Sequence, residues 1–385
     1  MVLINREKSG NDVIGQYFTP NYIAKFMVKK VLEFIKEVEL EPQNLKVLEP
    51  SVGKGIFIKY LIQNNVTDII AYEIDKNLKK PLLNAYPEVN FKFENVLGSD
   101  INDKNDLIIG NPPYLGQNYN ADIFQEYVKK FPICDKFFMG NMDLFYYFIH
   151  LAILKLKPGG FLSFITTNYW ITKSKKTGIK LLKPHILEEC FLLQYVDLSN
   201  IKVFKGAQGQ HNCIFVLRKK TENEKIQNND NPIEVIQIRK IKDINHLDDA
   251  SNERIFSDLI QNKKSKEILK YQSALTNKDL KGEGSWNVIY PKEVKKIVEN
   301  IEKLCSINNK ISLLKDYFII RNGLIFIKDD IFILKEDYNL KVENGAFYVK
   351  VNDKFLISKH NNPSTFEIWF LVSVEARPRR DWPGF

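Results

Sequence analysis

The tetrapeptide Asn111-Pro112-Pro113-Tyr114 carries the clearest chemistry in this chain, and it directly follows the apolar run Leu107 to Gly110. Such a run stopped by two prolines predicts a buried strand that ends abruptly, because proline cannot donate to the strand ladder. The tetrapeptide then lies at the carboxyl edge of a strand, where open α/β sheets bind ligands. An amide oxygen from Asn111 and a flat face from Tyr114 suit an amine on a planar ring, either a nucleobase amine or a carboxamide. The alternative is a strand-ending turn that merely contains two prolines.

A second candidate segment, Glu49-Pro50-Ser51-Val52-Gly53-Lys54-Gly55, separates an expected strand from an expected helix. Its two glycines allow a tight turn and a close backbone approach to a ligand, as in nucleotide-binding first loops. The third glycine of a dinucleotide fingerprint is absent, so a simple strand-helix turn explains the segment equally well. The chain also lacks the spacing of a P-loop lysine, which disfavours a nucleoside triphosphate.

An acidic residue, Glu73, ends the next expected strand, 24 residues after Glu49. An acid at this position can accept both hydroxyl groups of a ribose. A surface glutamate is the alternative for Glu73 taken alone. A ribose-binding acid with little phosphate-binding equipment favours an uncharged-linker nucleoside such as S-adenosylmethionine.

The elements that must position these groups alternate between helix and strand. Apolar residues at helical spacing predict helices, and short Val- and Ile-rich runs predict strands. The alternation is typical of an α/β protein with a mostly parallel, doubly wound sheet. The expected helices cover residues 21–39, 56–62, 76–84 and 144–156, and the expected strands cover 46–50, 69–73, 90–94, 107–109, 161–167 and 213–217.

The chain is longer than one core usually supports, so its 385 residues predict two domains. We expect a catalytic domain over residues 1–218, a polar linker over 219–232 and a mixed α+β domain over 233–385. In the second domain, short strands are expected at 233–238, 317–320, 324–327 and 331–334, with a helix at 291–304. The arginine-rich end, 376–385, is either a basic tail or a foreign segment.

Composition is that of an ordinary globular protein, with 44% hydrophobic and 27% charged residues and a net charge of +9. The positive charge permits a nucleic-acid partner without requiring one. Four scattered cysteines that form no cluster with the histidines disfavour a metal site or a disulfide framework. No apolar stretch is long enough to predict a membrane span. These features indicate a cytoplasmic protein with no metal and no membrane partner.

Taken in order along the chain, these motifs resemble a gamma-class DNA adenine-N6 methyltransferase of restriction-modification systems, of the Type II or IIG kind. The chain shows Gly15-Gln-Tyr17-Phe18-Thr19-Pro20, then Glu49 to Gly55, then Tyr72-Glu73-Ile74-Asp75, then Asn111 to Tyr114. The resemblance covers roughly residues 15–217. It implies a Rossmann-like methyltransferase fold, S-adenosyl-L-methionine as cofactor and double-stranded DNA as substrate.

The resemblance assigns roles to individual residues. Asn111 and the Pro112 carbonyl would accept hydrogen bonds from the target adenine, in the catalytic segment completed by Pro113 and Tyr114. Tyr114 and Phe204 would stack on opposite faces of that flipped-out base; an ordinary core aromatic is the alternative for Phe204. The residues implied in cofactor binding are Thr19, Pro20, Glu49, Pro50, Ser51, Gly53, Gly55, Glu73, Ile74, Asn95 and Val96.

At Asn95 and Val96 the chain departs from the family, which usually has an aspartate followed by an aromatic residue. Asn95 still offers an acceptor oxygen to the cofactor's adenine, whereas Val96 offers no ring for stacking. We therefore expect weakened cofactor binding.

Rival functions remain at this point. A protein glutamine-N5 methyltransferase would use the same Asn-Pro-Pro-Tyr segment, and a ribosomal-RNA adenine-N6 methyltransferase would recognise the same amine. A non-catalytic DNA-recognition subunit is the rival from another class.

Residues 233–385 resemble a partial target-recognition domain that is incomplete at its C-terminus, with the similarity around 311–334. We further expect a monomer, any restriction coming from a separate endonuclease, and weak or incompletely specific methylation by this chain.

Overall fold

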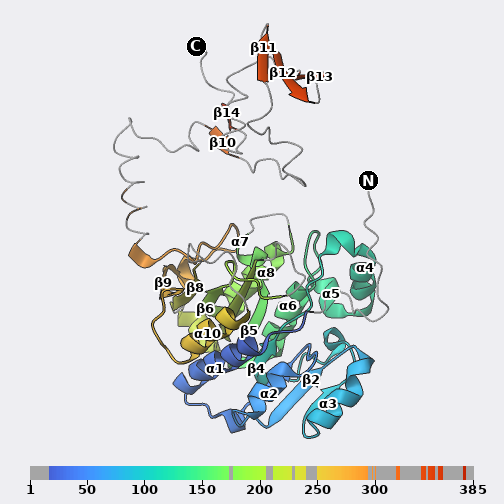
Figure 1. The fold of residues 1–385 in the computed structure, drawn as a ribbon. Coiled ribbons are helices and arrows are strands. Elements are labelled where there is room, and N and C mark those ends of the chain that lie inside the picture. The colour runs from blue at the N-terminus through green and yellow to red at the C-terminus, as the bar shows by residue number, and fades with distance from the viewer. Residues whose placement is uncertain are drawn as a thin grey trace. The chain divides into compact units, whose positions relative to one another are not determined.

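The structure of the protein is a computed structural model that divides the chain into two compact units, residues 1–296 and 297–385. It describes residues 17–172, 177–204, 211–227, 230–239 and 249–293, together with residues 297 and 300. For the second unit it describes the backbone of 318–320, 340–343, 346–351, 354–358 and 376–378. Each unit is considered by itself (Figure 1).

The first unit is built on a nine-stranded sheet of strand order β3-β2-β1-β4-β5-β7-β6-β8-β9 (Figure 1). Strands β1 to β5 run parallel, β7 is antiparallel to both β5 and β6, and β9 is antiparallel to β8. The expected α/β fold is therefore confirmed, with a mixed sheet. The strands are β1 (Lys46–Glu49), β2 (Asp68–Tyr72), β3 (Asn90–Lys92), β4 (Asn105–Gly110), β5 (Leu156–Thr167), β6 (Cys190–Asp197), β7 (Asn212–Lys219), β8 (Pro232–Ile238) and β9 (Ile268–Thr276).

Helices lie on both sides of this sheet (Figure 1). Helix α1 packs against α2 and α10, and α6 packs against α8. Residues of α6 are buried on nearly every face, which fits the largely apolar sequence of this helix. The helices are α1 (Asn21–Glu37), α2 (Ile56–Ile62), α3 (Lys79–Ala85), α4 (Ala121–Lys130), α5 (Pro132–Lys136), α6 (Phe145–Lys155), α7 (Tyr169–Thr172), α8 (Ile179–Glu189), α9 (Glu222–Gln227) and α10 (Asp249–Ile260).

The first unit continues past the boundary that we expected at residue 218. Strand β8 pairs in parallel with β6, and β9 pairs with β8, so the sheet runs on through the residues assigned to a second domain. The expected linker, 219–232, contains α9. The physical reason is that β6 would otherwise present an unpaired edge, and the apolar side chains of Ile233, Val235 and Ile236 are buried on joining it. The role of residues 233–385 in DNA recognition stays a prediction.

The described part of the second unit consists of short strands. Strand β10 (Phe318–Ile320) pairs with β14 (Ala376–Pro378), which belongs to the arginine-rich end of the chain. Strands β11 (Leu340–Glu343), β12 (Ala346–Val351) and β13 (Lys354–Ser358) form an antiparallel sheet. The strands expected at 324–327 and 331–334, and most of the helix expected at 291–304, lie outside the described residues. Within the described ranges, no helix has the length and apolar character needed to span a membrane.

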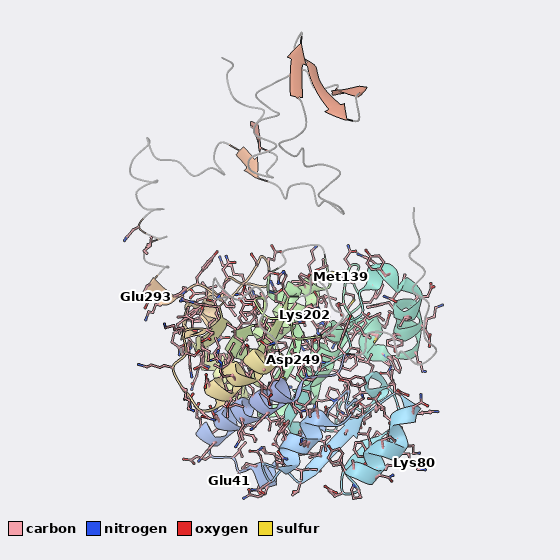
Figure 2. The ribbon with its side chains drawn as sticks, viewed as in Figure 1. Glu41, Lys80, Met139, Lys202, Asp249 and Glu293 are labelled. Atoms are coloured by element: carbon pink, nitrogen blue, oxygen red, sulfur yellow. The ribbon has the colours of Figure 1, made fainter. Side chains whose placement is uncertain are left out.

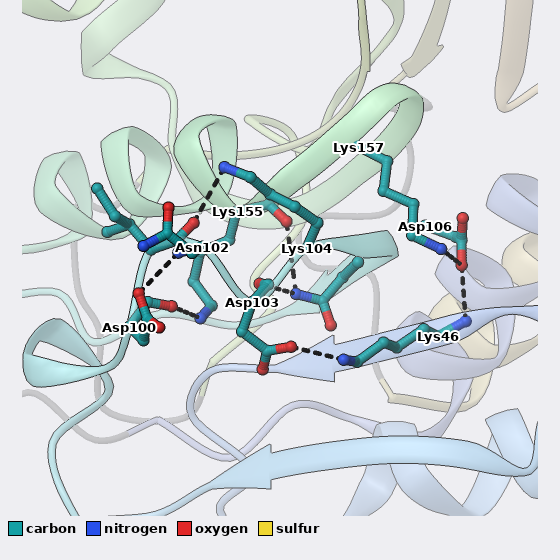
Figure 3. Close-up of polar contacts among 10 residues, drawn as sticks. Lys46, Asp100, Asn102, Asp103, Lys104, Asp106, Lys155 and Lys157 are labelled. Carbon is teal, nitrogen blue, oxygen red and sulfur yellow. Dashed lines mark hydrogen bonds and ion pairs between the residues drawn. The ribbon is translucent and has the colours of Figure 1, made fainter.

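A network of charged side chains ties the amino ends of β1, β4 and β5 together, at the edge of the sheet opposite Asn111 (Figure 3). The Lys46 backbone N–H and the Lys157 ammonium both donate to one oxygen of Asp106, at 2.9 and 2.8 Å. The Lys46 ammonium lies 2.5 Å from Asp103. These pairs are partly exposed, so each adds little stability.

Two histidines are buried together between α6 and α8. His150 and His185 approach with their Nδ1 atoms 2.8 Å apart, and both stack on the Phe137 ring. Burial lowers the pKa of His185 to about 4, with the nearby charges of Lys136 and Lys219 lowering it further and that of Glu189 opposing them. Burial, His185 and Lys136 also lower the pKa of His150 well below its ordinary value of 6.5.

The histidine pair predicts a loss of stability in mild acid. Below pH 6.5 the unfolded chain binds protons that the folded protein takes up only at the lowered pKa values of these histidines, which for His185 is about 4. The free energy of unfolding should therefore fall as the pH drops from 6.5 towards 4, and urea unfolding at pH 7.5, 6.5, 5.5 and 5.0 measures it. A His150→Phe/His185→Phe variant should lose less stability than wild type across this range. Equal losses in the two proteins would contradict the prediction.

Candidate active site

A pocket of about 390 Å³ lies at the carboxyl edge of β1, β2 and β4. Its lining combines the segment before α1 with the loops that follow these three strands, which is where an open α/β sheet places ligands. The predicted residues that line it are Thr19, Glu49, Pro50, Ser51, Gly53, Glu73, Ile74, Asn95, Val96, Asn111 and Pro113. The fold thus gathers eleven of the predicted residues around one cavity.

Asn111 is held rigidly at the end of β4. Its side-chain Nδ2 donates to the Tyr17 carbonyl at 2.8 Å, and its own carbonyl accepts the Ser51 hydroxyl at 2.9 Å. Its Oδ1 atom is buried and has no hydrogen-bond partner. Leaving a buried acceptor unpaired costs free energy, and a hydrogen-bond donor on a bound ligand would remove that cost.

Glu49 is a buried carboxylate without a partner. Its side chain is 0% exposed, and neither carboxyl oxygen has a hydrogen-bond partner. Burial, and secondly the charge of Glu73, raise the pKa of Glu49 well above its ordinary value of 4.5. A cation placed in the pocket would remove this penalty. The methionine end of S-adenosylmethionine carries such a group, its α-ammonium, so the donor set fits that cofactor.

Glu73 is fixed by the backbone of the glycine loop. The Gly53 N–H donates to Oε2 at 2.7 Å, and the Asp75 N–H donates to Oε1 at 2.8 Å. Each carboxyl oxygen keeps acceptor capacity for a ribose hydroxyl. Gly53 has φ 53°, a left-handed conformation that favours glycine, and this conformation aims its N–H at Glu73.

Gly55 does not line the pocket, but its surroundings leave no space for a side chain. A Cβ at this position would lie 2.7 Å from the Tyr86 ring, and φ is 78°. Among the residues found to line the pocket, Gly55 and Pro20 are absent. The Pro20 carbonyl instead accepts the first N–H groups of α1, from Ile23 and Ala24. The roles of Gly55 and Pro20 in cofactor binding stay predictions.

Asn95 and Val96 both line the pocket, and the side-chain oxygen of Asn95 already has a hydrogen-bond donor. Asn95 Oδ1 already accepts the Leu97 N–H at 3.0 Å, which caps a short 3₁₀ helix over Val96–Gly98. Tyr127 of α4 lines the same part of the pocket and hydrogen-bonds the Asn95 side chain. The sequence analysis missed Tyr127, whose ring supplies the aromatic surface that Val96 lacks. Only the packing of α4 against this edge brings it there.

The two aromatic residues predicted to hold the target base come together, but in a closed arrangement. Tyr114 and Phe204 are 7% and 3% exposed, with ring centroids 5.9 Å apart and ring planes at 70°. The Tyr114 hydroxyl donates to the Ile165 carbonyl at 2.9 Å. Tyr17, which also lines the pocket, contacts both rings. Pro112 is buried as well, whereas Lys202, two residues before Phe204, is exposed (Figure 2).

Comparison with known proteins identifies the central part of the chain. Residues 45–204 match the family described as Eco57I restriction-modification methylase. The Type II methyltransferase M.HincII of Haemophilus influenzae is 30% identical over 194 residues, which cover 50% of this chain and 35% of that protein. M.AccI of Acinetobacter calcoaceticus is 24% identical over 290 residues, which cover 72% of this chain and 47% of that protein. The chain thus spans less than half of the length of these relatives.

A solved structure supports the fold. The type IIG restriction endonuclease BpuSI superposes with a TM-score of 0.50 at 15% identity, covering 83% of this chain and 37% of that one. The family match begins one residue before β1 and ends at Phe204, so it takes in Glu49, Glu73 and the Asn111 segment. S-adenosylmethionine is accordingly the cofactor of this region. Over residues 45–204, this chain is similar to the Eco57I restriction-modification methylase family.

Proposed function

We propose that this chain is a site-specific DNA adenine-N6 methyltransferase that serves as the modification enzyme of a restriction-modification system. The observation that carries the proposal is the unpaired, buried Oδ1 of Asn111 beside a pocket that contains the unpaired carboxylate of Glu49. The first group suits the amine that is methylated, and the second suits the cofactor that supplies the methyl group. Type II methyltransferases among the relatives support the same activity.

The residues on the cofactor side of the pocket would bind and orient S-adenosylmethionine. Glu49 would pair with the cofactor's α-ammonium group, Glu73 would accept its ribose hydroxyls, and Ile74, Val96 and Tyr127 would contact its adenine. When bound, S-adenosylmethionine supplies a methyl group made electrophilic by its sulfonium. The protein's contribution is to hold this methyl group in line with the target nitrogen, and positioning of this kind supplies much of the rate enhancement.

On the substrate side, Asn111 Oδ1 and the Pro112 carbonyl would accept hydrogen bonds from N6 of a flipped-out adenine. These bonds draw the N6 lone pair out of conjugation with the ring, so that it can attack the methyl carbon. The bound cofactor would supply the methyl group with its sulfonium sulfur as the leaving group, and N6 would lose a proton to solvent. Tyr114 and Phe204 would hold the faces of the base.

Transfer of labelled methyl groups tests the proposed function directly. The 385-residue chain, incubated with tritiated S-adenosylmethionine, should incorporate label into duplex DNA, and methylation-sensitive sequencing should find N6-methyladenine at a defined site. Competition with duplex RNA and with a glutamine-containing protein should leave incorporation unaltered. No incorporation into any DNA would refute the enzyme assignment and favour a non-catalytic DNA-recognition subunit, whereas preferential labelling of RNA or protein would favour the two other methyltransferase readings.

A Phe204→Ala variant should raise the KM for DNA by roughly tenfold or more, because stacking of a base on an aromatic ring is worth about 1–3 kcal/mol. Steady-state methylation at varied DNA concentration measures the effect. Because Phe204 is buried, Phe204→Leu provides a second variant that keeps more of the packing. Calorimetric titration should give wild-type cofactor affinity for both variants. An unchanged KM in both would show that Phe204 is an ordinary core residue.

The remaining parts of the proposal concern context. We infer that residues 233–385 contribute to DNA recognition, that the enzyme acts as a monomer in the cytoplasm, and that a separate endonuclease supplies any restriction. The described cysteines 134, 190 and 213 are free and buried, which suits a reducing compartment. Sedimentation of the purified chain with and without DNA tests the monomer assignment.

A further inference from the structure

The ring of Tyr17 lies against both aromatic rings assigned to the target base. Its centroid is 5.8 Å from that of Tyr114 and 5.5 Å from that of Phe204, with interplanar angles of 34° and 38°. Tyr114 and Phe204 are themselves 5.9 Å apart and nearly perpendicular. A base sandwiched between two rings needs them about 7 Å apart and parallel, because aromatic carbons pack about 3.5 Å from one another. The three rings therefore leave no room for a stacked base.

The backbone of Tyr17 has a separate task. Its carbonyl accepts the Asn111 Nδ2–H at 2.8 Å, which fixes the amide plane and leaves Oδ1 as the free acceptor. This contact involves no atom of the Tyr17 side chain. The ring can consequently leave by rotation about its own side-chain bonds while the carbonyl keeps Asn111 in place.

Tyr17 also connects the two halves of the site. It lines the same pocket as Glu49 and Glu73, and its ring contacts the aromatic pair beyond Asn111. It is half-buried, whereas Tyr114 and Phe204 are almost fully buried with the ring in place. The ring thus occupies the position that a base must take to bring its amine to Asn111.

We propose that the Tyr17 ring fills the target-base site in the DNA-free protein and is displaced by the entering base, while the Tyr17 carbonyl keeps Asn111 oriented. This inference rests on the proposed function and assigns Tyr17 as a positioning residue. The ring keeps the aromatic walls packed before DNA arrives, and its displacement adds to the cost of base entry. Base entry should therefore be easier when residue 17 has no ring.

A comparison of two DNA duplexes tests this role in the 385-residue chain. One duplex contains the adenine that the wild-type enzyme methylates, and the other has an abasic site at that position, so that no base needs to enter. Tyr17→Ala should bind the intact duplex roughly tenfold more tightly than wild type, since about two aromatic contacts no longer have to be broken. Its affinity for the abasic duplex should stay at the wild-type value. Tyr17→Phe, which keeps the ring, should restore the wild-type ratio of the two affinities.

Other outcomes overturn the inference. Equal changes for both duplexes would mean that Tyr17 acts on the structure in general, and weaker binding of the intact duplex would make its ring a wall of the base site. An unchanged ratio would mean that the ring does not compete with the base. Cofactor titration of Tyr17→Ala verifies that the variant is folded.

The two proposals fail in different ways. If wild-type protein methylates DNA and the Tyr17→Ala ratio is unchanged, only the role of Tyr17 is lost. If wild-type protein methylates no DNA, the proposed function fails and the inference about Tyr17 fails with it.

Discussion

An Asn111→Ala variant should bind S-adenosylmethionine as wild type does and yet transfer methyl groups roughly a thousandfold more slowly or not measurably. The change removes the only side-chain acceptor assigned to the target amine, and loss of one such preorganised group typically costs about 10²–10³ in kcat. The side chain's Oδ1 is buried and unpaired, so its removal costs no internal hydrogen bond at that atom. Single-turnover transfer of labelled methyl groups at saturating DNA measures the rate.

Two controls make the Asn111 result decisive. Asn84→Ala is the same substitution at an exposed position on α3 and should leave transfer at the wild-type rate. Calorimetric titration of Asn111→Ala with cofactor should show wild-type affinity, which separates a catalytic defect from a folding defect. Transfer by Asn111→Ala within about threefold of wild type would refute the assignment of Asn111.

A Glu49→Gln variant should have opposite effects on cofactor binding and on the stability of the cofactor-free protein. Without cofactor, the buried carboxyl has a pKa well above 4.5, so wild-type stability is fully present below pH 4.5 and is lost as the pH rises towards the raised pKa. Glutamine has no such proton to lose. The variant should therefore unfold at a higher temperature than wild type at pH 7.5, with the difference closing near pH 4.5.

Cofactor binding should reverse that order. Loss of the charge that faces the α-ammonium group should weaken binding roughly a hundredfold, since breaking a buried charge pair costs about 2–5 kcal/mol. Wild type should consequently gain more thermal stability from added S-adenosylmethionine than the variant does. Glu88→Gln, the same change at an exposed position, serves as the matched control. Equal cofactor affinity in Glu49→Gln and wild type would remove Glu49 from the binding site.

The elements around the glycine loop and Asn111 followed from local sequence patterns. The helix expected at 56–62 matches α2 residue for residue, and the strand expected at 107–109 lies inside β4. Glu49 and Glu73 each stand at the end of a short apolar run of the kind that forms a buried parallel strand. Because parallel strands end at one edge of a sheet, their trailing polar groups gather there whatever else the fold does.

Elements whose formation depends on distant partners were not predictable in the same way. The first unit incorporates β8 and β9 because β6 offers an open edge, and a short apolar run such as 233–238 does not reveal which edge it will join. The predicted boundary at residue 218 failed for this reason. Strand β6 and helix α8, which precede β7 in sequence, also gave no signal strong enough to be placed.

The sequence by itself determined which polar groups reach the binding edge, because strand ends and glycine turns are encoded by neighbouring residues. Only the tertiary structure decided what those groups face. The hydrogen bond from the Asn111 side chain to the Tyr17 carbonyl joins residues 94 positions apart. The burial that leaves the Glu49 carboxyl group without a hydrogen-bond partner comes from the packing of the whole pocket. Periodicity and turn chemistry describe a residue's surroundings along the chain, whereas burial and ring contacts depend on segments that meet only after folding.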